Sequence, residues 1–462
     1  MGNKKRIGEN KAVIFIKAFF LVMVMGLIAI LILMFIQKEK ELSDTEASEN
    51  VNSNFDIVST EATESATVNA DGSKTDASDL LTQDSSDTSD SSGTSEATNT
   101  SDSSGASDAT NTSNSSGATS SSDKSNSSDA TEEVGKTYTK EAVDKTQVTM
   151  LFGGDILFDD NYSAMISLKK RENKVADCFS TDLLEVMKQA DIFMVNNEFP
   201  YTDRGEPTQG KTFTFRSLPE NAGYLSDMGI DIVTIANNHA YDYGKTGLLD
   251  TIHTLNSYKI PFVGAGSNLD EASEPAYFKI NNMTIAIIGT TQMERLANPD
   301  TKGATATEPG VFRCMEIDKL LETIKEAKEK SDFVVVYVHW GTENLPDVDW
   351  GQKLQVNKIV EAGADLIVGA HAHVLQEVDY IEGTPVAYGL GNFWFNSKAV
   401  DTGLLEVTLS NNGKVTCKFI PCRQENCKTT MLKGAEKTAL LDYMDELSPN
   451  VNLDSDGIFS YP

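Results

Sequence analysis

The chain has 462 residues, with 39 Lys and Arg against 69 Asp and Glu, so its formal net charge is −30. A chain this acidic argues against nucleic-acid binding, because the phosphate backbone is held through a basic surface. The five cysteines are odd in number and spread along the chain, which excludes the disulfide framework of a small secreted domain. Of this total, residues 146–462 carry a net charge of −18.

The first segment predicts a membrane anchor. Residues 18–36 form nineteen consecutive residues without a charge, and at ~1.5 Å per residue they span about 28 Å, close to the thickness of a hydrocarbon core. A cleaved signal peptide is the alternative, but the run is long for one and no small-residue cleavage site follows it. Because residues 1–17 are basic, we expect them in the cytoplasm and everything after residue 36 outside.

Residues 37–145 predict a disordered linker. They are rich in Ser, Thr, Asp, Ala and Asn and hold few large apolar side chains, too few to offset the entropy of ordering. A 12-residue unit repeats within them, as TSDSSGTSEATN at 88–99 and TSDSSGASDATN at 100–111. The unit has no apolar face, so stacking into a solenoid is not expected. We interpret the segment as a tether that holds the following domain away from the membrane.

Residues 146–425 predict one α/β domain, because short β-branched runs alternate with helical patterns. Two Asn-rich stretches, 281–282 and 411–413, indicate hairpin turns. The C-terminal segment 426–462 shows one helical stretch, at 435–447. The expected strands are 148–152, 192–196, 230–235, 284–289, 333–338, 366–368 and 386–388, and the expected helices are 180–189, 219–228, 244–258, 316–330 and 350–361.

Polar clusters follow the predicted strands where each one ends. Since the carboxyl ends of strands in an open α/β sheet line its ligand crevice, we expect these clusters to meet at one rim. Four of the five histidines in the chain fall in them, and His253, on a predicted helix, does not. The residues that we expect to converge are Asp155, Glu198, Asn238, His239, His339, His371 and His373.

This set of side chains predicts a metal site. Carboxylate, amide and imidazole ligands together suit Mn, Fe or Zn, and the absence of Cys from the clusters argues against a closed structural zinc site. A carboxylate such as Glu198 can bridge two ions ~3.5–4 Å apart, the spacing of two-metal hydrolases. We therefore expect two divalent transition-metal ions. Any one histidine taken alone is more often a structural residue than a ligand, so the prediction depends on the whole set.

The clusters, in this order, resemble those of the poly-γ-glutamate capsule-synthesis CapA family, a branch of the calcineurin-like metallophosphoesterases. The resemblance covers roughly residues 147–400. It implies a four-layer α-β-β-α sandwich and membership of a membrane complex that makes or exports poly-γ-glutamate. The stretches that carry it are GGDILFDD (153–160), NNEFP (196–200), FRSLPE (215–220), GIDIVTIANNHAYDYG (229–244), VHWGTE (338–343), GADLIVGAHAHVLQ (363–376) and GLGNFWF (389–395).

The resemblance also implies a role for each site residue. Asp155 and His373 would hold the first metal, Glu198 would bridge, and Asn238, His339 and His371 would hold the second. His239, beside Asn238, would protonate a leaving oxygen. The family pattern has Asp-x-His on the first strand, whereas this chain has Leu157 at the third position, and Asp159 or Asp160 are candidate replacements.

The sequence leaves several questions open. Arg216 is a candidate for binding a substrate carboxylate or phosphate, with a structural role as the alternative. The function is either capsule-polymer synthesis or export, metal-dependent hydrolysis of another extracytoplasmic substrate, or a non-catalytic scaffold for partner membrane proteins. Cys422 and Cys427 are either paired or, like Cys417, reduced. The three tryptophans, at 340, 350 and 394, are expected in the core.

Overall fold

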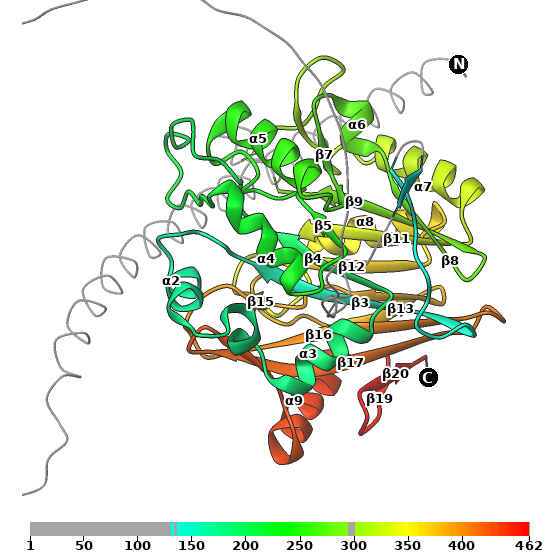
Figure 1. Cartoon of the computed structure of the whole chain (residues 1–462). Coiled ribbons are helices and arrows are strands. Elements are labelled where there is room, and N and C mark those ends of the chain that lie inside the picture. Colours follow the sequence, from blue (N-terminus) through cyan, green and yellow to red (C-terminus); the bar gives the residue numbers. More distant parts are fainter. Residues whose placement is uncertain (1–130, 134–135, 294–300, 462) are drawn as a thin grey trace, which may run out of the picture. The chain divides into compact units, whose positions relative to one another are not determined.

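The computed structural model describes residues 131–133, 136–293 and 301–461 (Figure 1). The anchor predicted at 18–36 and most of the linker predicted at 37–145 lie outside these ranges. Among the residues that the structure does describe, no helix is both long enough and apolar enough to cross a membrane. All of the description below concerns the α/β body.

A ten-stranded sheet carries the predicted site residues Asp155, Glu198 and Asn238 at the ends of its strands. Its central strands β3, β4, β5 and β6 are parallel, whereas β16 and β17 form a long antiparallel hairpin beside β3. Two short strands branch from it, β15 (Asn392–Trp394) on β3 and β18 (Lys428–Met431) on β17. The strand order is β19 (Asn452–Leu453), β20 (Ile458–Ser460), β17 (Val415–Glu425), β16 (Val400–Ser410), β3 (Gln147–Ile156), β4 (Ile192–Asn197), β5 (Ile232–Thr234) and β6 (Phe262–Val263).

An eight-stranded sheet carries the predicted site residues His339 and His371 at the ends of its strands. Its strands β9, β11, β12 and β14 are parallel, and β8 and β13 pair antiparallel with β9 and β14. β7 (Ala265–Gly266) and β10 (Gly310–Val311) pair with each other in a small two-stranded sheet. The order in the large sheet is β1 (Thr131–Glu133), β2 (Thr137–Thr139), β8 (Ala276–Ile280), β9 (Met283–Thr291), β11 (Phe333–Trp340), β12 (Leu366–His371), β14 (Thr384–Ala387) and β13 (Val378–Ile381).

Three apolar cores show how the layers pack. Because side chains alternate along a strand, β3 sends Met150 and Phe152 into a core shared by the two sheets and Leu151 into a core under helices. That second core joins the ten-stranded sheet to α2 (Ser163–Lys170), α3 (Thr181–Gln189), α4 (Gly223–Asp227) and α5 (Gly244–Ser257). A third joins the eight-stranded sheet to α6 (Leu269–Ser273), α7 (Asp318–Lys330) and α8 (Trp350–Glu361).

The mixed α/β fold with multi-stranded sheets is therefore confirmed, and the predicted helices are found within a few residues of their expected bounds. One of them, 219–228, is divided into a 3₁₀ turn, η2 (Pro219–Ala222), followed by α4. Both Asn-rich stretches form the expected turns: Asn281 and Asn282 have positive φ between β8 and β9, and 411–413 joins β16 to β17.

Segments at both ends of the body join its sheets. Within the predicted linker, β2 pairs with β8, and within the predicted C-terminal segment β18 and β20 pair with β17. The helix expected at 435–447 is α9 (Gly434–Leu447), and its Leu440, Leu441 and Met444 pack in the core between the sheets. The apolar face of α9 therefore completes the end of that core.

Two side-chain expectations are resolved by the fold. Trp340 and Trp394 are fully buried, and the indole N–H groups donate to the carbonyls of Tyr388 and Cys427. Trp350 was expected in the core, and that prediction is wrong: it begins α8 and is 77% exposed. Cys417, Cys422 and Cys427 are buried free thiols, so the reduced alternative holds.

Candidate metal centre

The predicted site residues stand at the carboxyl ends of parallel strands in both sheets. Asp155 lies near the end of β3 and Glu198 directly follows β4. On the other sheet His339 lies near the end of β11, and His371 is the last residue of β12. Since strands of the same direction end at one edge, side chains that are far apart in the sequence are brought to a common rim.

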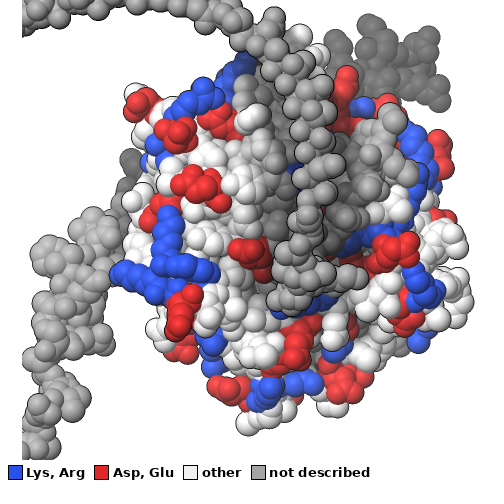
Figure 2. Space-filling model, viewed as in Figure 1, with Lys and Arg blue, Asp and Glu red and all other residues white. Residues whose placement is uncertain are grey.

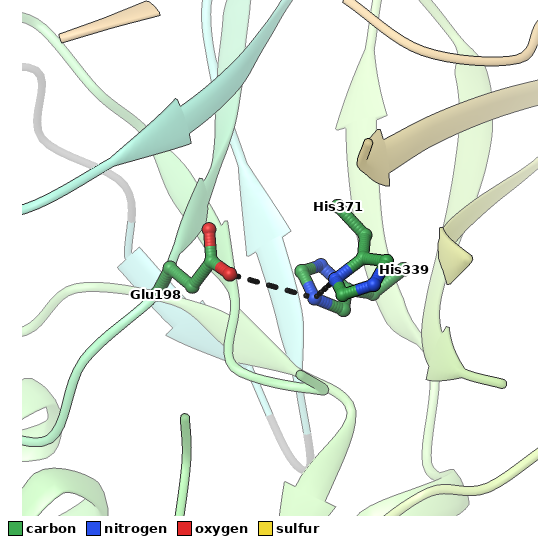
Figure 3. A group of neighbouring side chains, drawn as sticks. All are labelled: Glu198, His339 and His371. Carbon is green, nitrogen blue, oxygen red and sulfur yellow. Dashed lines mark hydrogen bonds and ion pairs between the residues drawn. The ribbon is translucent and has the colours of Figure 1, made fainter. Parts of the chain in front are cut away.

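The first group of possible ligands is Glu198, His339 and His371, whose ligand atoms lie within 4.8 Å of one another. Figure 3 shows the carboxylate of Glu198 facing the two imidazoles across the space between the sheets. Nε2 of His339 lies 3.6 Å from Oε1 of Glu198 and 3.0 Å from Nδ1 of His371. A nitrogen of each ring is thus directed at the same point as a carboxylate oxygen.

The second group is Asp155, Glu198 and His373, again with ligand atoms within 4.8 Å of one another. Nδ1 of His373 lies 3.1 Å from Oδ2 of Asp155, and Nε2 of the same ring lies 3.8 Å from Oε1 of Glu198. Glu198 therefore belongs to both groups. This is the position that a carboxylate bridging two adjacent ions occupies.

Glu198 is also the residue that the protein leaves unsatisfied. Both of its carboxylate oxygens are buried and neither has a hydrogen-bond partner among the described residues. An unpaired buried polar group costs roughly 1–3 kcal/mol, and a buried charge without a partner costs more. A divalent cation between the two groups would satisfy both oxygens, so the residues present fit a metal.

Asn238 completes the first group. Its Oδ1 lies 2.9 Å from Nε2 of His339, and it follows β5 in a buried turn. The six residues predicted as ligands are therefore all brought together. We find the two groups at the ends of β3, β4 and β5 on one sheet and of β11 and β12 on the other.

The electrostatics of the centre follow from its burial. Desolvation raises the pKa of Glu198, and the neighbouring charge of Asp155 raises it further. Desolvation lowers the pKa of His339, as do the adjacent imidazoles, so this ring is neutral and can act as a ligand. Burial also lowers the pKa of His373, but the carboxylates of Glu198 and Asp155 outweigh it and raise that pKa to about 10.

His239 lies beside the metal groups in a separate hydrogen-bonded pair. Its Nδ1 lies 2.7 Å from Oδ2 of Asp242, which is completely buried. Asp242 also accepts from the backbone N–H of Phe215 at 2.6 Å and pairs with the ammonium of Lys211. Lys211 in turn donates to the carbonyl of Asn238 at 2.7 Å. Asp242 thus fixes the orientation of the His239 ring and leaves Nε2 as its proton-exchanging atom.

Three asparagines support the ligands, and sequence reasoning assigned them no role. The Asn196 amide donates to Asp155 at 2.7 Å and lies 3.2 Å from Nδ1 of His339, so it links the two groups. The side-chain amide of Asn237 donates to Oδ1 of Asn196 at 3.0 Å. The side-chain oxygen Oδ1 of Asn392 lies 2.9 Å from Nδ1 of His373. Each asparagine lies within one of the strand-end clusters, which was the available signal.

The backbone around the ligands is closely fitted. A Cβ at Gly154 would lie 1.9 Å from the carbonyl oxygen of Gly391, so only glycine allows the approach that precedes Asp155. His371 and His373 both have positive φ, at 97° and 57°. Residues other than glycine rarely adopt such angles, and such strain gathers at functional sites.

Arg216, the candidate for substrate binding, makes several contacts within the fold. Its guanidinium donates to the carbonyls of Arg204 and Gly205 at 3.1 and 2.8 Å and stacks over the ring of Tyr243 at 3.6 Å from the centroid. These contacts hold the 204–205 loop and favour the structural alternative. The neighbouring Phe215 is the residue of this stretch that reaches the site, with its ring 4.2 Å from that of His239.

Leu157 and the two candidate replacements for the first-strand imidazole also take structural positions. Leu157 is fully buried in the core under the helices. Asp159 accepts from the backbone N–H of Arg216, and Asp160 accepts from the backbone N–H of Leu218. The suggestion that either aspartate replaces the missing imidazole is therefore corrected, because neither belongs to the metal groups found among the described residues.

The comparisons with known proteins place the chain in a family. The family described as "Bacterial capsule synthesis protein PGA_cap" matches residues 149–397, which is more than half of the chain. The chain is 33% identical over 253 residues to "PGA biosynthesis protein CapA" of Bacillus subtilis, covering 53% of this chain and 64% of the relative. It therefore spans less than two thirds of that relative's length.

Two further relatives match part of the chain. "Capsule biosynthesis protein CapA" of Bacillus anthracis is 28% identical over 295 residues, which cover 60% of this chain and 68% of the relative. "Probable polyglutamine synthesis accessory protein Rv0574c" of Mycobacterium tuberculosis is 27% identical over 208 residues, which cover 44% and 55%. The matched residues include every strand end that carries a candidate ligand, and the chain belongs to the PGA_cap family of bacterial capsule synthesis proteins.

Proposed function

We propose that this chain takes part in the synthesis or export of a poly-γ-glutamate capsule, as an extracytoplasmic domain with a two-metal centre. The names of the Bacillus relatives support the polymer, and Glu198 supports the metal centre. Its two buried, unpartnered oxygens lie between two groups of further ligands, and this single observation carries the proposal.

The residues of the centre divide into three roles. Asp155 and His373 would hold one divalent transition-metal ion, Asn238, His339 and His371 the other, and Glu198 both. When bound, two such ions supply a water of lowered pKa and Lewis-acid polarisation of an electrophile. The metal identity that the ligand types favour is Mn, Fe or Zn.

The chain's own contribution to proton transfer is His239. Asp242 holds its Nδ1, so Nε2 is the atom that would donate a proton to a departing oxygen or nitrogen. Burial lowers the pKa of His239, against the opposing charge of Asp242, so a proton on Nε2 is readily given up. Phe215, stacked on the ring, keeps water from one of its faces.

The anchoring and partners form part of the proposal. The apolar run at 18–36 would fix the chain in the membrane with its N-terminus in the cytoplasm, and partner membrane proteins of the polymer complex would meet the body outside. Digestion of intact cells by an added protease should remove the body. Its protection in intact cells, together with digestion after lysis, would contradict this orientation.

The proposal is tested by metal content and by capsule together. Elemental analysis of the purified full chain should find about two equivalents of transition metal, and far less after both His371→Ala and His373→Ala. In a capsule-forming host, deletion of the gene should abolish the polymer, and the wild-type gene should restore it. An unchanged amount of polymer after deletion would refute the proposed function.

A second function, hydrolysis of another extracytoplasmic substrate, is favoured by one observation. The His239–Asp242 pair is an arrangement for proton transfer, which a purely structural metal site does not need. Phosphoesterase turnover that disappears in His239→Ala would support this function. Capsule restored fully by His239→Ala, but not by an empty vector, would instead indicate a non-catalytic scaffold.

A further inference from the structure

A cluster of basic side chains stands out on this acidic chain. The stretch 169–174, KKRENK, holds four basic residues and one acidic residue, whereas residues 146–462 as a whole carry −18. It closes α2 and runs into η1 (Lys174–Cys178). Figure 2 shows Lys and Arg gathered on the surface in the area where Figure 1 places α2.

Two other elements bring further lysines to the same surface. Arg171 donates to the carbonyls of Asn426 and Cys427 at 3.1 and 2.8 Å, so the β17–β18 turn lies against the end of α2. That turn is followed by the exposed Lys428. The backbone N–H of Asn426 donates to the carbonyl of Ser397 at 3.1 Å, which brings the exposed Lys398 beside the turn.

We define the basic patch as Lys169, Lys170, Arg171, Lys174, Lys398 and Lys428. Within the described ranges, no carboxylate lies at ion-pair distance from Lys170, Lys174, Lys398 or Lys428, whereas Lys169 pairs with Asp160. The acidic members of the stretch 169–177 are Glu172 and Asp177, and Asp177 accepts hydrogen bonds from Asn173. Lys428 also lies opposite Glu425 in the β17–β18 register, and Arg171 and Lys428 interact with the carboxylate of Asp177. The patch therefore holds six basic side chains against Asp160, Glu172, Asp177 and Glu425, an excess of two positive charges.

A short segment of the chain, residues 395–398, joins the metal centre to the patch. The ring of Phe395 lies 5.0 Å from that of His373 and 5.8 Å from that of Phe215. Lys398 follows three residues later in the same loop, and the contacts described above lead from Ser397 to Asn426 and then to Arg171. These contacts therefore connect His373 to the lysines of the patch through the protein.

We propose that the basic patch binds a polycarboxylate chain and guides it along the surface to the metal centre. This inference rests on the proposed function, which supplies a polymer with one carboxylate per unit. Exposed ammonium groups spaced over three elements suit such a repeating anion, because each contact is weak and the contacts act together. The positive charge of the patch also offsets the repulsion between the acidic body and an anionic polymer.

The test measures binding of fluorescently labelled poly-γ-glutamate to the full chain in detergent, by anisotropy, with chelator present to exclude metal bridging. The variant replaces Lys170, Lys174, Lys398 and Lys428 with Gln. We expect about tenfold weaker binding, since each exposed contact contributes only a few-fold. Binding by the wild-type chain should also weaken with added salt.

Two matched variants make the result specific. Changing the same four lysines to Arg keeps the charge and should keep the affinity. The second variant changes Lys325, Lys330, Lys353 and Lys358 to Gln. These lysines are exposed on α7 and α8, which cover the other sheet, and the net charge of the protein changes by the same amount. This variant should keep the affinity within about twofold of the wild type. Equal loss in this control would overturn the proposal, and so would unchanged binding in the patch variant.

Further outcomes distinguish a failure of the basic-patch proposal from a failure of the proposed function. Binding of the wild-type chain to phosphatidylglycerol vesicles, lost in the patch variant, with no polymer binding, would assign the patch to a membrane surface and overturn the proposal. Suppose that gene deletion removes the capsule, and that a patch variant restores it and binds the polymer normally. This result would refute the role of the patch and leave the proposed function standing. Capsule that persists on deletion would refute the proposed function instead.

Discussion

Oε1 of Glu198 lies 3.6 Å from Nε2 of His339, and neither side chain exposes any surface to solvent. A buried carboxylate normally accepts hydrogen bonds, yet both oxygens of Glu198 lack a partner among the described residues. The carboxylate and the imidazole, which come from different sheets, thus form a pair that a cation between them would complete. This arrangement and its surroundings lead to five predictions.

Replacing Glu198 with Gln should have opposite effects without and with metal. In chelator the variant should be as stable as the wild type or more so, by up to about 3 kcal/mol, because an uncharged amide costs less to bury than a carboxylate whose two oxygens accept no hydrogen bond. With Mn²⁺ added, the wild type should gain stability by mass action and the variant should gain little. Thermal unfolding of both proteins with and without the ion measures the difference.

Glu185→Gln is the matched control, because Glu185 is exposed on α3 and should leave both measurements unchanged. A Glu198→Gln protein that keeps the full metal-induced stabilisation would show that this carboxylate is not a ligand.

The two ligand groups should differ in their response to pH. The pKa of His373 is raised to about 10, so a metal must displace its proton throughout the range below that value, and affinity there falls as pH falls. The lowered pKa of His339 leaves that ring neutral, and Glu198, whose pKa is raised, is common to both groups, so the groups differ in the imidazole proton of His373. At pH 6 we therefore expect about one bound ion and at pH 8 about two, measured by elemental analysis after gel filtration.

The pKa of His373 also has a consequence for folding without metal. Because its folded pKa lies above the ordinary value of about 6.5, its contribution to stability is fully present below pH 6.5 and is lost as pH rises towards 10. The stability difference between the wild type and His373→Gln in chelator should therefore shrink over that range. A difference that grows with pH would contradict the raised pKa.

Leu157→His should not create the missing ligand. Leu157 is fully buried in the core under α2 to α5, so an imidazole there loses apolar packing and buries polar atoms, at a cost of about 3 kcal/mol. We expect a lower midpoint in urea and no additional bound metal. Leu157→Met, which conserves volume, should cost less than about 1.5 kcal/mol. An extra equivalent of metal in Leu157→His would show that this position faces the centre.

Asp242 and Lys211 should be strongly coupled. Asp242 is completely buried and pairs with Lys211, whose side chain is 4% exposed. Removing one partner takes the opposite charge of the ion pair away from a buried group, so Asp242→Asn and Lys211→Met should each destabilise by about 3–5 kcal/mol. The double variant should lose less than the sum, by about 1–3 kcal/mol.

Urea unfolding of the four proteins of this cycle measures the coupling. The exposed pair Lys319–Glu322 on α7 gives a comparison pair, for which we expect coupling below about 1 kcal/mol. Additive losses at Lys211 and Asp242 would mean that the two side chains act independently.

Local sequence accounts for most of the secondary structure of the body. β-branched runs became β9 and β11, the Asp349–Gln352 capping box begins α8 where the pattern placed its start, and paired asparagines form the β8–β9 turn. These features depend on residues within a few positions of one another. The long β16–β17 hairpin, whose turn the sequence predicts, pairs with β3 through contacts that span the whole domain, and its place in the sheet is not encoded locally.

The candidate site divides in the same way. Polar clusters after apolar strands identified Asp155, Glu198 and the histidines, because strand ends in α/β sheets meet by topology. Only the tertiary structure shows that Glu198 lies between two ligand groups, that Asp242 holds His239, and that Leu157 packs in the core under the helices. Those roles depend on which side chains approach through space, since a residue type records the chemistry it can perform and not the neighbours that folding will bring to it.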